Sequence, residues 1–124
     1  MAENIKVSHY RTGEPIQYFD YDNDSTNSNI YGKLYDWDAI NDNRGVCPEG
    51  FHIPSDAEFK NLEMFLGMSQ DQADTVGWRG DIEGGKLKEI GTEHWNSPNS
   101  GAENLFGFTA LPGGHKENPV NNNN

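Results

Sequence analysis

The sequence is poor in cysteine, in basic residues and in long apolar runs, and each shortage excludes a class of function. One cysteine in 124 residues cannot form an internal disulfide. Nine lysines and arginines against 20 acidic residues give a formal net charge of -11, which repels nucleic-acid phosphates. No apolar run approaches the ~18 residues that a membrane-spanning helix needs. We therefore expect neither a nucleic-acid partner nor a membrane span in this chain.

Aromatic residues and glycines are abundant, and they favour a compact, turn-rich fold. Three tryptophans, five tyrosines and six phenylalanines can bury large areas, and such residues are scarce in chains that never fold. Fourteen glycines indicate many turns. We expect a single domain over residues 1–116 and a disordered polar tail over residues 117–124, because the run Asn121–Asn124 has no core-forming content.

The first 40 residues predict extended chain, a loop and a short helix in turn. The segment Thr12–Pro15 has the composition of a turn, with a short extended piece on each side of it. Residues 20–29 are polar throughout and favour a surface loop. Apolar residues recur at three-residue steps within residues 31–40, which predicts a helix of about three turns with Trp37 in the core.

The clearest predicted element is a helix that begins after Ser55. This serine is an N-cap residue, and Glu58 stands three positions later, which is the pattern of a capping box. Gly67 is a natural C-cap residue for the same helix. The predicted buried face of the helix consists of Phe59, Leu62, Phe65 and Leu66.

The second half of the chain is irregular. A loop follows the helix as far as Gly85, and Val76 and Trp78 are its expected anchors. Residues 86–90 fit a short strand or a turn. Alternation over Phe106–Leu111 predicts a strand.

Three aspartates form a candidate calcium site. Asp20, Asp22 and Asp24 occupy the first, third and fifth positions of a calcium-loop pattern, and oxygen ligands at that spacing suit Ca²⁺. The pattern lacks the glycine and the glutamate that complete such a loop, which favours a solvated acidic turn instead. Calcium is thus the one cofactor that the sequence suggests, and both interpretations stay open.

Cys47 and His52 are candidates for catalysis, but their surroundings favour structural roles. The neighbours of Cys47 are valine and proline, which carry no charge that would lower the pKa of the thiol. His52 lies between Phe51 and Ile53, which favours a packed side chain over a ligand or a base, and no further metal-ligating residue stands at ligand spacing from it. We therefore predict no catalytic residue, and we assign structural roles to Cys47, Ser55, Glu58 and Phe59.

The predicted ligand-binding residues lie in loops of the second half. Trp78 and Trp95 are flanked by polar residues and glycine, so their rings can either stack on sugar rings or fill a small core. On the first alternative, the candidate ligand-binding residues are Trp78, Trp95, Asn96 and His115.

Three segments of the chain resemble the Fibrobacter succinogenes major paralogous domain family. They are Tyr31–Trp37, Cys47–Phe59 and Gly107–Gly114. The resemblance implies an α+β fold of C-type-lectin-like type, as in the formylglycine-generating enzymes, with two short helices on a small, irregular, mainly antiparallel sheet and long loops. Members of the family are typically exported or surface-anchored bacterial proteins.

The resemblance also implies that the domain is incomplete at both ends. Family members carry an exported leader before the segment that resembles Met1–Ile5, and further strands with a second cysteine after the segment that resembles Gly107–Gly114. On this basis we expect the closing strands to be missing here. The absent cysteine would be the natural partner of Cys47.

From the resemblance we expect a non-catalytic recognition module at the bacterial surface that binds a glycan or a protein through its loops. Two alternatives stay open. One is a variable ligand-binding protein of a diversity-generating retroelement, which the asparagines at 118 and 121–124 fit loosely. The other is an oxidase related to the formylglycine-generating enzymes, against which the solitary Cys47 argues.

Overall fold

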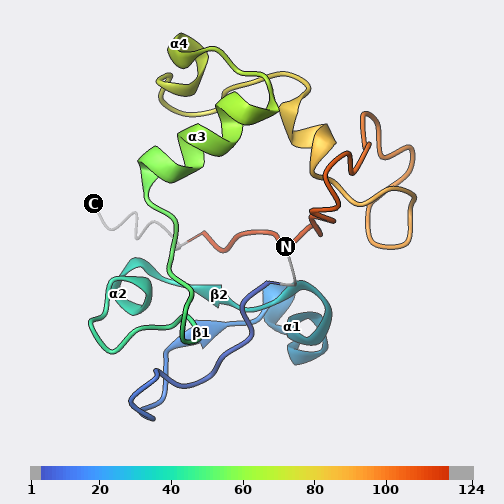
Figure 1. The fold of residues 1–124 in the computed structure, drawn as a ribbon. Helices are drawn as coiled ribbons and strands as arrows, with labels where there is room; N and C mark the ends of the chain where they lie inside the picture. Colours follow the sequence, from blue (N-terminus) through green and yellow to red (C-terminus); the bar gives the residue numbers. More distant parts are fainter. Residues whose placement is uncertain (1–3, 118–124) are drawn as a thin grey trace, which may run out of the picture. The chain divides into compact units, whose positions relative to one another are not determined.

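The computed structural model describes residues 4–117, which fall into two compact units (Figure 1). Within the described part of the chain, the N-terminal unit comprises residues 4–51 and 113–117, and the helical unit comprises residues 52–112. Four α-helices and one two-stranded antiparallel sheet are present in residues 4–117, so the α+β class is confirmed, whereas the expected number of two short helices is wrong. No helix in this range has the length and apolar character needed to cross a membrane. The asparagine-rich tail from residue 118 onward lies outside the described residues.

The sheet of the N-terminal unit joins two very short strands. β1 (Tyr18–Phe19) runs antiparallel to β2 (Leu34–Tyr35), with Tyr18 opposite Tyr35 and Phe19 opposite Leu34. The predicted turn before β1 is confirmed. There the amide of Tyr10 donates to the carbonyl of Glu14 at 2.9 Å, and Gly13 takes a φ of 100° that favours glycine.

The segment 20–29, predicted as a loop, contains helix instead. A 3₁₀ helix, η1 (Tyr21–Asn23), is followed by α1 (Ser25–Tyr31). Asp24 is the N-cap of α1, because its side chain accepts from the amide of Thr26 at 2.9 Å. The prediction was wrong because a short polar side chain that bonds its local backbone can begin a helix as readily as it forms a turn.

The predicted three-turn helix over residues 31–40 is also wrong. Gly32 (φ 85°) ends α1, the chain then forms β2, and only one turn of helix follows, α2 (Trp37–Ile40). Asp36 caps this turn by accepting from the amide of Ala39 at 2.8 Å. Trp37 therefore opens α2 and is 70% exposed, whereas Ala39 is the residue of this helix that enters the core.

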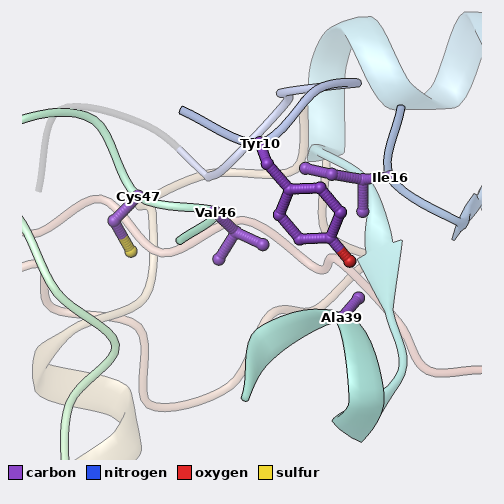
Figure 2. Packing of buried hydrophobic residues seen from close by; sticks show 5 residues of the cluster. All are labelled: Tyr10, Ile16, Ala39, Val46 and Cys47. Atoms are coloured by element: carbon purple, nitrogen blue, oxygen red, sulfur yellow. The ribbon is translucent and has the colours of Figure 1, made fainter. Parts of the chain in front are cut away.

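The core of the N-terminal unit is small and gathers residues from widely separated segments. Its buried members are Tyr10, Ile16, Ala39, Val46 and Cys47 (Figure 2). The structural role predicted for Cys47 agrees with this position, since its side chain packs among apolar neighbours. The loops that carry these residues are thereby held together around α2.

The main element of the helical unit is α3 (Asp56–Leu66), and its predicted capping box is confirmed. Ser55 Oγ accepts from the amide of Glu58 at 3.3 Å, and Glu58 Oε2 accepts from the amide of Ser55 at 2.9 Å. Gly67 ends the helix as expected. The predicted buried face is wrong in part: Leu66 is buried and Leu62 half-buried, but Phe59 and Phe65 are exposed.

The chain after α3 is held by polar contacts, and the two apolar anchors predicted for it are wrong. Val76 and Trp78 are fully exposed. The loop that follows α4 (Gln70–Ala73) is fixed instead by Arg79, whose guanidinium forms an ion pair with Glu63 at 2.8 Å. A 3₁₀ helix, η2 (Glu83–Lys86), comes next.

The predicted strand over residues 106–111 is absent. Within the described residues its one ladder contact is a parallel bridge between Ala110 and Lys88. Thr109 has a φ of 54°, and its amide donates to the side chain of Asn104 at 2.7 Å. This local contact bends the backbone out of the extended conformation that a strand requires.

Candidate functional site

Two adjoining hollows lie beside residues 113–117 in the N-terminal unit. The first, which we call the aromatic hollow, has a volume of about 350 Å³ and is lined by Phe19, Leu34, Tyr35, Asp36, Trp37, Gly114, His115 and Lys116. The second, the acidic hollow, has a volume of about 260 Å³ and is lined by Asp20, Tyr21, Asp22, Asn23, Leu34, His115, Lys116 and Glu117. Leu34, His115 and Lys116 belong to both.

The walls of the aromatic hollow are fixed by contacts within the N-terminal unit. The hydroxyl of Tyr35 donates to the carbonyl of Val7 at 2.8 Å, and burial of this side chain raises the pKa of Tyr35 to about 12. Lys116 Nζ lies 4.0 Å from the centre of the Phe19 ring, a cation–π contact. The phenol of Tyr35 is thus a fixed, neutral wall of the hollow.

Trp37 supplies the most accessible apolar surface of this hollow. It follows Asp36, and the cap made by Asp36 sets the start of α2 and hence the position of the indole. An exposed ring beside carboxylate, imidazole and ammonium groups offers a ligand both an apolar face and hydrogen-bonding partners. The arrangement suits a ligand that is itself amphipathic, as a sugar ring is.

The three aspartates of the predicted calcium site are not brought together. Asp20 and Asp22 line the acidic hollow, and Asp20 Oδ1 accepts a hydrogen bond from the hydroxyl of Ser28. Asp24 is committed to capping α1, and the amide and hydroxyl of Thr26 lower the pKa of its carboxyl group. In the described part of the chain, the three carboxylates form no group close enough to share one ion.

The predicted ligand-binding residues are placed in different environments. His115 lines both hollows of the N-terminal unit. In the helical unit, Trp78 is fully exposed, whereas Trp95 is half-buried and donates through Nε1 to the carbonyl of Ala110 at 3.0 Å. The carbonyl of Asn96 accepts from the amide of Asn99 at 2.9 Å. Of the four, only His115 lines either hollow.

Sequence reasoning missed Phe19, Tyr35 and Trp37 as lining residues of a site. Trp37 was placed in the core because its spacing from Leu34 matches a helix. The signal against that interpretation was Asp36, an N-cap residue immediately before the tryptophan. A helix that begins at Trp37 cannot also place Leu34 on its buried face.

Cys47 has the surroundings of a structural thiol. The residue is 7% exposed, and burial raises the pKa of its thiol, which disfavours the nucleophilic thiolate. His52 is exposed, with Nε2 2.9 Å from Glu58 Oε1. The prediction of a packed side chain at this position is therefore wrong, because the imidazole is exposed and pairs with the glutamate that caps α3.

Comparison with known proteins gives one match. A family model described as the Fibrobacter succinogenes major domain matches residues 1–124. No curated protein and no solved structure matches the chain.

Proposed function

Because the chain belongs to the Fibrobacter succinogenes major domain family, we propose that it is a non-catalytic recognition domain that binds a glycan in the aromatic hollow. The observation that carries the proposal is the 70% exposed ring of Trp37 at a hollow also lined by Phe19 and Tyr35. A ligand that covers this large apolar ring removes it from water, and the buried apolar area contributes to the free energy of binding.

The rim of the hollow supplies the polar part of the recognition. Asp36, His115 and Lys116 present acceptor and donor groups around the aromatic walls. A glycan needs both parts, since the C–H face of a sugar packs on an aromatic ring while its hydroxyl groups take hydrogen bonds. The volume of about 350 Å³ lies at the small end of the range for ligand sites, which suits one or two sugar units better than a folded protein.

The state of Cys47 supports the proposed non-catalytic role against the oxidase alternative. An oxidase that works through cysteine needs an accessible thiolate, and Cys47 is a buried thiol whose pKa is raised. We propose with this function a C-type-lectin-like fold and a location at the bacterial surface, both of which the family resemblance implies.

The test is a panel of soluble glycans titrated into the protein, with Trp37→Ala and Trp78→Ala as paired variants. Trp78 is a matched control because it is a fully exposed tryptophan that lines neither hollow. We expect saturable binding of at least one glycan, weakened ~10-fold or more by Trp37→Ala and unchanged by Trp78→Ala. Equal losses in the two variants, or no glycan bound by the wild type, would contradict the proposal.

A further inference from the structure

A second cluster of chemically capable side chains lies in the helical unit and plays no part in the proposed glycan site. Glu89, Glu93 and His94 each offer one ligand atom, and these atoms lie within 4.8 Å of one another. His94 Nδ1 is 2.8 Å from Glu89 Oε2 and 3.1 Å from Glu89 Oε1. Within residues 4–117 this is the one group of three or more such residues close enough to share an ion.

The distances in this cluster resemble those between ligands of one ion. Two ligand atoms bound tetrahedrally at the ~2.0–2.1 Å typical of zinc stand about 3.3 Å apart. The 3.1 Å between His94 Nδ1 and Glu89 Oε1 is close to this value. The side chains of Glu89 and His94 are only 17% and 23% exposed, while Glu93 is exposed and can adjust its rotamer to close the set.

The loop that carries the three residues is held by a buried asparagine. Asn99 is 9% exposed, and its Nδ2 donates to the backbone carbonyls of Glu89 at 2.9 Å and Gly91 at 2.6 Å. Its Oδ1 is the buried side-chain atom without a hydrogen-bond partner in the described part of the chain. A buried acceptor left unpaired costs stability unless a water, an ion or a ligand supplies the missing contact.

From these observations we propose that Glu89, Glu93 and His94 form a binding site for a divalent transition-metal ion of the Zn²⁺ class. One imidazole nitrogen with two carboxylates suits zinc or manganese, whereas calcium and magnesium prefer oxygen ligands alone. Water completes the coordination at the exposed side next to Glu93.

An ordinary ion pair is the competing explanation, and the chain contains a matched example of one. His52 Nε2 and Glu58 Oε1 stand 2.9 Å apart, close to the 2.8 Å between His94 and Glu89. Among the described residues no third ligand residue joins this pair, and Glu58 is committed to the cap of α3. If a His–Glu pair alone attracted zinc, both sites would do so. Zinc binding that depends on His94 but not on His52 therefore distinguishes a metal site from an ordinary ion pair.

The experiment is isothermal titration of ZnCl₂ into the untagged full chain in a buffer that does not chelate metal. We expect one ion bound per chain. His94→Ala and Glu93→Ala should each lower the affinity at least ~10-fold, with His52→Ala as the control that leaves it unchanged. Glu93 is exposed, so this variant keeps the fold even if removal of His94 disturbs the loop.

Three results would overturn the proposal. They are the absence of saturable zinc binding to the wild type, an affinity that survives both His94→Ala and Glu93→Ala, and an equal loss in His52→Ala. Titration of CaCl₂ gives an independent check, because calcium bound as tightly as zinc, and lost in the same two variants, would contradict the assignment to a transition metal.

Discussion

Gly85 lies so close to the backbone of Gly101 that a Cβ atom on Gly85 would overlap the carbonyl oxygen of Gly101. Two hydrogen bonds join the same segments, from the amide of Glu103 to the carbonyl of Gly85 at 2.9 Å and from the amide of Leu105 to the carbonyl of Lys86 at 2.8 Å. Because residues 52–112 contain no β-strand, these contacts hold η2 to residues 101–105.

We expect Gly85→Ala to destabilise the protein by about 1–3 kcal/mol, because the added methyl group forces the two backbone segments apart. Gly84→Ala is the matched control. It changes the neighbouring residue of the same 3₁₀ helix, where an added Cβ meets no atom within 4 Å. Its unfolding free energy should stay within a few tenths of a kcal/mol of wild type or rise slightly. Equal effects of the two substitutions in urea denaturation would show that the contact with Gly101 does not matter.

The N-cap of α3 is the second place where one side chain has a measurable effect. Ser55→Ala leaves the amide of Glu58 without its acceptor and should cost about 1 kcal/mol of unfolding free energy. Ser100→Ala changes an exposed serine that caps no helix and should leave stability unchanged. Thermal and urea unfolding of the two variants against wild type measure the difference. A Ser55→Ala protein as stable as wild type would contradict a contribution from the capping box.

The same contact predicts an acid transition for one carboxyl group. The amide and the hydroxyl of Ser55, with His52, lower the pKa of Glu58 from 4.5 to about 2. Because the folded pKa lies below the unfolded value, the stability that the ionised carboxylate contributes is present above about pH 4.5 and is lost as the pH falls toward 2. Carboxyl-carbon NMR should give a midpoint of about 2 for Glu58, and Ser55→Ala should raise it. A wild-type midpoint at 4.5 would contradict the structure.

The features that sequence predicted correctly are those whose partners lie within a few residues. The turn at Thr12–Pro15 and the capping box of Ser55 and Glu58 depend on local side-chain and backbone geometry, which the residue types determine. Such patterns can still be ambiguous. The run of aspartates and asparagines before Tyr31 is compatible with both a loop and a capped helix. Only the structure shows that Asp24 is the N-cap of α1.

The features that sequence did not predict depend on contacts between distant residues. Trp37 and Phe65 fit the apolar face of a helix, yet both are exposed, and Phe65 packs on Phe106 with ring centres 4.9 Å apart instead of entering a core. Nothing in the spacing of the sequence joins Trp37 to His115, which lie on one hollow. Periodicity states which residues share a face, but not whether another part of the chain covers that face.

The last prediction concerns the reactivity of Cys47, which separates a structural thiol from a catalytic one. Cys47 packs with Val46 in the buried cluster (Figure 2), and burial raises the pKa of its thiol above the ordinary value of 9.0. The native protein should therefore react with a thiol reagent such as dithionitrobenzoate far more slowly at pH 8 than the same protein in urea, since reaction needs both access and thiolate. Because a raised pKa keeps the thiol protonated to a higher pH, the native rate should still be rising above pH 9, whereas an activated cysteine reaches its full rate below neutral pH. A native rate equal to the unfolded rate, or one already constant at pH 7, would show an accessible thiolate and would favour the oxidase over the recognition domain.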